Sequence, residues 1–174
     1  MTRTIAREIA VQLVYSLSIN KLDAREMLAF FFDESYYSTL KQEEPLYTDR
    51  PDKVQREYIE QLVTGVAENR DRLRDYIEKY AKNWKIGRIS KTAVSAMEVS
   101  IYEILYMEDI PNAAAINEAV EVSKGYEEQE TVAFINGILG SFIRGELSGM
   151  GAGEQSGAPE ESHEPGYDGE RENS

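Results

Sequence analysis

Apolar residues recur at helical spacing along most of this 174-residue chain, and the alternation typical of half-buried strands is nearly absent. Near the N-terminus, Ile5, Ile9, Leu13 and Leu17 follow one another at intervals of four residues, which places them on one face of a helix. Similar stripes predict further helices over about 23–33, 59–66, 73–80, 90–110, 113–124 and 131–146. We therefore predict an all-α protein, a helical bundle of about seven helices with short connections.

Prolines and glycines mark the expected ends of these helices. The segment from Glu34 to Pro51 is predicted to be a loop, and Pro111 disfavours helical geometry at the residue before it. Gly125 is expected to cap a helix C-terminus, and a bend near Asn69 is compatible with the pattern around it. Gly65 lies inside a stripe, where glycine costs about 1 kcal/mol against alanine, so we expect close helix packing there.

Three residues interrupt the apolar runs of the last two predicted helices: Asn117, Asn136 and Gly137. No base, nucleophile or ligand partner lies near them in the sequence. We expect them to be buried hydrogen-bonding or helix-packing positions, with Gly137 allowing a neighbouring helix to approach closely.

The negative charge of the chain is unevenly distributed. The formal net charge is −13, and residues 148–174 hold seven acidic residues against one arginine, together with six of the twelve glycines. Such a segment buries too little apolar surface to offset its ordering entropy. We predict one helical domain over 1–147, followed by a disordered, acidic, glycine-rich tail over 148–174. The acidic domain argues against non-specific duplex binding, although a local basic patch is still compatible with nucleic-acid binding.

Several classes of protein are disfavoured by composition. The chain has no cysteine, which removes disulfides, thiolate metal sites and a cysteine nucleophile. It also has no run of about eighteen apolar residues, the length expected of a membrane-spanning helix. The first residues lack a small-residue cleavage site, so we interpret them as the first helix and not as a signal peptide. A cytoplasmic protein is the simplest interpretation.

Catalytic and metal-binding patterns are weak. His163, the one histidine, lies in the acidic tail, where no scaffold would hold a catalytic or metal site. Glu118 and Glu121 lie three residues apart, with Lys124 three further on, but a carboxylate metal site needs Glu-x-x-His pairs on facing helices. We interpret this group as a solvated face with charge pairing. Gly-rich phosphate loops are also missing, so we predict no enzyme, no metal and no cofactor.

One stretch stands out electrostatically. Lys82, Lys85, Arg88 and Lys91 occur within ten residues with no acidic residue among them, and Trp84 lies in their midst. We call residues 82–91 the basic connection. Cations beside an exposed aromatic ring suit single-stranded RNA, because bases stack on the ring while cations meet phosphates. The alternative is that Trp84 is a core residue and the lysines only solubilise a loop.

Two other groups of cations are less distinctive. Arg3 and Arg7 form a weaker cluster at the N-terminus, with Tyr15 further along the same predicted helix. A third group, Arg70, Arg72 and Arg74, alternates with Asp71 and Asp75 and is typical of a mixed surface.

Several segments, in order over roughly residues 3–145, match a known family pattern: Ala6–Leu17, YIEQLVTGV (58–66), the Tyr80–Trp84–Arg88 spacing, IYEILYMEDIP (101–111), AINEAVEVSK (115–124) and FINGIL (134–139). On these segments, the chain resembles the NusB family of bacterial transcription antitermination factors. The same helical module also occurs fused to RNA methyltransferase domains, for which this chain has no room.

This resemblance implies a fold of two packed helical subdomains and a function in transcription. With the ribosomal protein NusE, the family binds the boxA element of nascent RNA and joins the RNA polymerase antitermination complex, notably on ribosomal RNA operons. RNA contact is expected at Arg3, Arg7 and Tyr15, to which the residues themselves add Lys82, Lys85, Arg88 and Lys91 of the basic connection. Partner contact is expected at Glu121, Lys124 and Glu130.

Departures from the family pattern leave two alternatives open. Thr4 and Ile5 stand where relatives often have arginines, and Glu98 replaces an arginine, which reverses a charge on its helix. The chain could therefore be a protein–protein scaffold with little RNA binding of its own, or a homodimer that buries the RNA face. An aromatic cluster over 30–47, rich in Phe and Tyr, is interpreted as local packing and not as a partner site.

Overall fold

The computed structural model describes residues 1–82 and 84–148, and this part of the chain contains seven α-helices and no strand. The prediction of an all-α fold is thereby confirmed. The helices are α1 (Arg3–Ile19), α2 (Ala24–Phe31), α3 (Glu34–Glu43), α4 (Lys53–Tyr80), α5 (Lys91–Tyr106), α6 (Asn112–Lys124) and α7 (Gln129–Phe142). Three short helical turns accompany them, η1 (Pro45–Tyr47), η2 (Ile86–Arg88) and η3 (Ile143–Leu147). His163 and the predicted tail beyond Ser148 lie outside the described residues.

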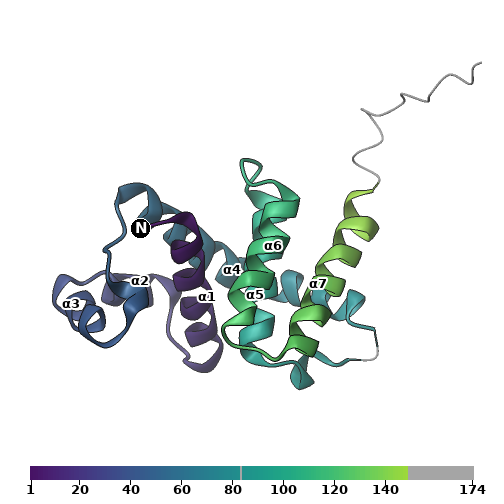
Figure 1. The fold of residues 1–174 in the computed structure, drawn as a ribbon, viewed down its shortest axis with the longest axis horizontal. Helices are drawn as coiled ribbons and strands as arrows, with labels where there is room; N and C mark the ends of the chain where they lie inside the picture. The colour runs from purple at the N-terminus through teal and green to yellow at the C-terminus, as the bar shows by residue number, and fades with distance from the viewer. Residues whose placement is uncertain (83, 149–174) are drawn as a thin grey trace, which may run out of the picture.

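Helices α1, α4 and α5 pack against one another and form the centre of the molecule (Figure 1). On one side of this centre lie α2 and α3, and on the other lie α6 and α7. The long helix α4 contacts both α2 and α7, so it joins the two sides. Fully buried side chains such as Ile9, Ile59, Leu62 and Met97 fill the space between the central helices.

Side-chain caps explain where several helices begin. Asp23, Asp33 and Asp52 precede α2, α3 and α4, and the carboxylate of each accepts hydrogen bonds from backbone N–H groups of the first turn. Thr2 and Ser90 serve α1 and α5 in the same way with their hydroxyl groups. These bonds satisfy donors that the helix itself leaves unpaired.

The predicted loop between Glu34 and Pro51 is wrong over its first ten residues, which form α3. Two contacts account for this helix. The carboxylate of Asp33 accepts from the backbone N–H of Ser35 and Tyr36, and Tyr37 is buried against Phe31 with ring centroids 5.5 Å apart. The aromatic cluster packs locally, as predicted, although Phe30 stays 61% exposed.

The segments predicted separately as 59–66 and 73–80 belong to one continuous helix, α4. Near its middle, the side-chain amide of Asn69 donates to the carbonyl oxygen of Gly65 at 2.8 Å, within the helix. Gly65 packs closely, as expected: a Cβ placed on it would lie 2.1 Å from Cζ of Tyr102 on α5. The glycine therefore permits α4 and α5 to approach.

The expectation of buried polar positions in the last two helices is wrong. Asn117, Asn136 and Gly137 are exposed, and a Cβ on Gly137 would meet nothing within 4 Å. Ile135 and Ile138 on α7 are buried at a spacing of three residues, so they occupy the face toward the core. The two residues between them consequently face outward.

Arg70 and Arg74 on α4 do not belong to a mixed surface, because both bind a buried carboxylate. Nε of Arg70 lies 3.0 Å from Oε2 of Glu98, and Nε of Arg74 lies 3.4 Å from Oε1. Arg70 also donates to the carbonyl oxygen of Val14 on α1 at 3.1 Å. Burial raises the pKa of Glu98, and the two guanidinium groups oppose that rise. Glu98 thus links α5 to α4, and through Arg70 to α1.

No helix in the described part of the chain is both long and apolar enough to cross a membrane.

Candidate nucleic-acid interface

The basic connection leaves α4 after Tyr80 and enters α5 at Lys91, with the short turn η2 between them. Two apolar residues fix its ends, because Ala81 is 2% exposed and Ile89 is 7% exposed. Backbone bonds from Trp84 N–H to Ala81 and from Arg88 N–H to Lys85 shape the turns. The connection is therefore anchored by buried apolar residues, while its four charged side chains are exposed.

All four cations of the basic connection, Lys82, Lys85, Arg88 and Lys91, are exposed. None of them forms an ion pair with a residue that the structure describes. In a chain with a net charge of −13, these are cations that acidic neighbours have not neutralised. Such a group is available to an anionic ligand such as a phosphodiester backbone.

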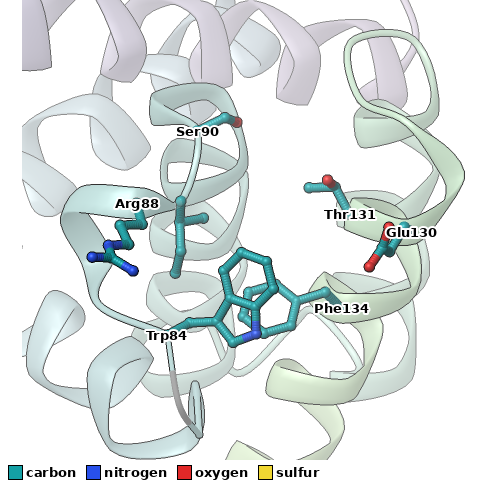
Figure 2. A pocket seen from close by; sticks show the side chains of 7 residues that line it. Trp84, Arg88, Ser90, Glu130, Thr131 and Phe134 are labelled. Carbon is teal, nitrogen blue, oxygen red and sulfur yellow. The ribbon is translucent and has the colours of Figure 1, made fainter.

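Trp84 is 49% exposed, which rules out the alternative that it is a core residue. Its ring packs on Phe134 of α7, with centroids 5.0 Å apart and planes inclined at 45°. The two rings belong to a groove of about 380 Å³ between the basic connection and α7, which we call the Trp84 groove. Figure 2 shows the indole in this groove, with Arg88 on one side and Glu130 and Thr131 on the other; Ser90 completes the labelled lining.

Tyr15 lies close to the basic connection in space. It is half-buried and lines a groove with Thr92, in the first turn of α5, and Tyr126. One turn further along α1, Ser18 lines another groove together with Lys91. The end of α1 thus lies beside the start of α5, next to the basic connection.

Arg3 lies at the other end of α1, about 18 Å from Tyr15 along the helix axis at 1.5 Å per residue. It is half-buried, and its guanidinium carbon lies 4.0 Å from the ring centroid of Tyr58. The predicted group of Arg3 and Tyr15 is therefore two separate places on the surface. Only Tyr15 adjoins the basic connection.

Arg7 is a buried residue, 4% exposed, and not a surface cation. Its Nε lies 3.0 Å from Oε1 of Glu103, and its Nη1 lies 3.2 Å from Oε2 of Glu118. The hydroxyl of Tyr58 also donates to Glu103, whose pKa is raised by burial against the opposing charge of Arg7. With its guanidinium bound in this network, Arg7 has no surface for a phosphate, and we remove it from the candidate interface.

Glu118 was expected on a solvated face and instead belongs to the Arg7 network, where it also accepts from the hydroxyl of Thr4 at 3.3 Å. Glu121 and Lys124 are exposed and pair with each other, as their spacing indicates. Glu130 is exposed in the first turn of α7 and lines the Trp84 groove. Within the described residues, no three His, Cys, Asp or Glu side chains gather as a metal site would require.

The sequence did not predict that Phe134 and Thr131 of α7 line a groove together with residues of the basic connection. In the sequence, Phe134 was considered as part of the FINGIL segment, and its pairing with Trp84 depends on how α7 packs against the end of α4. The Tyr80–Trp84–Arg88 spacing and FINGIL were both noted, but no signal within either segment indicates that they meet.

Residues 4–144 match the family model described as the NusB family. The chain belongs to the NusB family. A transcription antitermination protein NusB of Acetivibrio thermocellus is 42% identical over 147 residues, covering 84% of this chain and 92% of the relative. A NusB of Clostridium botulinum is 35% identical over 144 residues, covering 83% of this chain and 99% of the relative.

The fold agrees with this assignment. A solved structure of T. maritima NusB superposes with a TM-score of 0.68 at 25% identity, covering 83% of this chain and 92% of that chain. The helices that carry the basic connection and the Trp84 groove therefore belong to the NusB fold. The family resemblance stated from the sequence is confirmed.

Proposed function

We propose that this protein is a transcription antitermination factor that binds boxA-type single-stranded RNA together with the ribosomal protein NusE. The complex would join RNA polymerase, notably on ribosomal RNA operons, in the cytoplasm. Membership of the NusB family supports the role in antitermination. The observation that carries RNA binding is the exposed basic connection, whose four cations lack acidic partners among the described residues.

The chemistry of this face favours single strands over duplexes. Trp84 and Tyr15 offer aromatic surface beside cations, and only unpaired bases can stack on such rings. The strong overall negative charge disfavours binding that depends on charge alone. Contact of four or five cations with phosphates, the basic connection with or without Arg3, predicts that log affinity falls with log salt at a slope of roughly −3.

NusE is proposed to bind elsewhere on the surface and to extend the RNA-binding face. Glu121 and Lys124 on α6 are exposed and offer charges of both signs to a partner, whereas Glu130, also expected at a partner contact, lies in the Trp84 groove on the RNA-binding face. Two weak RNA surfaces held in one complex bind more tightly than either alone, because the second contact becomes intramolecular.

A titration of boxA-type RNA at several salt concentrations, with and without NusE, tests this proposal. The variant replaces Lys82, Lys85, Arg88 and Lys91 by Gln. The matched control replaces four exposed cations elsewhere, Lys21, Arg25, Lys41 and Lys53, by Gln and so makes the same change in net charge.

We expect the first variant to lose affinity and most of its salt dependence, and the control to keep both. Adding NusE should raise the affinity of the wild type. Equal RNA binding by the two variants would refute the basic connection as the RNA site. NusE binding without any RNA binding would instead identify the chain as a protein–protein scaffold.

A further inference from the structure

The Trp84 groove combines features that contact between cations and phosphates alone does not explain. Trp84 is the only tryptophan of the chain and leaves half of its surface in water, although Phe134 offers a second ring 5.0 Å away. An exposed indole face is costly as pure structure, since burying a large aromatic side chain is among the strongest apolar contributions to folding. The groove therefore has an open aromatic wall.

The opposite side of the groove is polar. Glu130 and Thr131 lie across from the basic connection, and neither side chain makes a hydrogen bond to any residue the structure describes (Figure 2). Ser90 differs, because its hydroxyl already bonds the backbone of Ala93 and the carboxylate of Glu127. Two polar groups are thus free to bond the edge of a ligand whose face lies on Trp84.

One lining residue of the groove is positively charged, and two more cations are its neighbours in the sequence. Arg88 lines the groove itself, and Lys85 and Lys91 flank it in the sequence, all exposed. A ligand that suits the whole site has a flat face, hydrogen-bonding edges and attached anionic groups. An apolar peptide side chain has none of these and would leave Glu130 and Thr131 without partners.

We propose that the Trp84 groove holds one unstacked base of single-stranded RNA. The base stacks on the indole of Trp84, its edge bonds Glu130 and Thr131, and the flanking phosphates contact Arg88 and its neighbouring lysines. A volume of about 380 Å³ lies at the lower end of the range for small-ligand pockets, which suits a single base. This inference rests on the proposed RNA-binding function and adds the place of one nucleotide.

The lone tryptophan makes the proposal measurable in the unmodified protein. Titration of the wild type with boxA-type RNA should quench the intrinsic tryptophan fluorescence in step with binding, because every photon emitted by a tryptophan comes from Trp84. Replacing Trp84 by Ala should weaken binding between about 5-fold and about 150-fold, the range for loss of one base–aromatic stack. Trp84→Phe should retain part of the affinity.

Salt dependence distinguishes stacking from phosphate contact. Because Trp84→Ala removes no cation, its log affinity against log salt should keep the wild-type slope at a lower affinity. Phe30→Ala is the matched control: Phe30 is an exposed aromatic on α2, on the other side of the molecule, and its loss should leave RNA binding unchanged (Figure 1).

Two failures can be told apart. Wild type that binds RNA without quenching, together with Trp84→Ala that binds as tightly, overturns the base site and leaves RNA binding through the cations in place. Absence of RNA binding by the wild type at any salt concentration, with NusE present, overturns the proposed function as well.

Discussion

The arginines at the centre of the molecule and the cations of the basic connection have the same charge and opposite environments. Arg7 and Arg70 project from α1 and α4 onto carboxylates of α5 that are fully buried. Arg88, eight residues after the end of α4, is exposed and has no carboxylate partner among the described residues. One group of cations holds helices together, and the other is left for a ligand.

The difference follows from solvation. A cation taken out of water needs a close anion and further hydrogen bonds, and breaking such a pair leaves a buried charge uncompensated. An exposed cation keeps its water and contributes little to folding, so its removal is nearly neutral for stability. The comparison therefore predicts that variants in the two regions affect different measurements.

Arg7→Met should have the largest effect on stability. Methionine keeps much of the apolar stem of the side chain but leaves the carboxylate of Glu103 buried without its guanidinium. We expect a loss of about 3 kcal/mol in the free energy of unfolding and a fall of about 10 °C in melting temperature. Urea and thermal unfolding measure these changes.

Arg3→Met on the same helix is the control. Arg3 is half-buried above the ring of Tyr58 and forms no ion pair within the described chain, so we expect a loss of about 1 kcal/mol or less. Equal destabilisation by Arg7→Met and Arg3→Met would contradict the distinction between buried cations that pair with carboxylates and cations that form no ion pair.

Gly65→Ala tests the close approach of the central helices without changing any charge. The new methyl group would lie 2.1 Å from Cζ of Tyr102, so the ring or the helices must move. Overpacking of this kind costs about 1–3 kcal/mol, measured by urea unfolding. An unchanged midpoint would mean that Tyr102 moves aside at no cost, and that the glycine is not needed for packing.

The sequence predicted the helices well and the partners of their charged residues poorly. Stripes such as Ile5–Leu17 are local patterns, and they were sufficient to predict an all-α fold. The ion pair of Arg7 and Glu103 spans 96 residues, and no local pattern identifies which cation lies inside.

A similar limit applies to the candidate site. The run without acidic residues from Lys82 to Lys91 was evident in the sequence, but its exposure and its contact with α7 depend on packing. Pro45 and Pro51 led to the prediction of a loop over the segment that contains α3, and the cap at Asp33 that begins this helix was not recognised in the sequence. Asn136 and Gly137 were wrongly predicted to be buried. Periodicity shows which apolar residues share one face of a helix, but it does not show what the residues beside that face contact.

Gly137→Ala should stabilise the protein, in contrast to Gly65→Ala. The position is exposed within α7, and nothing lies within 4 Å of the added Cβ. Alanine gains up to about 1 kcal/mol over glycine in a helix, which urea unfolding should detect as a higher midpoint. A loss as large as that of Gly65→Ala would contradict the exposed placement of this face.

Glu146→Gln should have the smallest effect, visible mainly as a change with pH. Glu146 in η3 accepts hydrogen bonds from Lys79 and from the hydroxyl of Tyr80 at 2.7 Å, and the bond from Lys79 is the main reason that the pKa of its carboxyl is lowered from 4.5. A lowered pKa in the folded state means that the ionised carboxylate stabilises the fold above the unfolded pKa. That contribution is lost as the pH falls through the folded pKa.

The melting temperatures of wild type and Glu146→Gln should therefore differ at about pH 7 and converge as the pH falls below 4.5. Lys79→Gln removes the donor of the same contact and should reduce the pH dependence in the same way. If the difference in melting temperature between wild type and Glu146→Gln stays constant down to about pH 3, the charge of Glu146 is not what holds η3 against α4. In that case this exposed ion pair would resemble the cations of the basic connection, with no measurable part in folding.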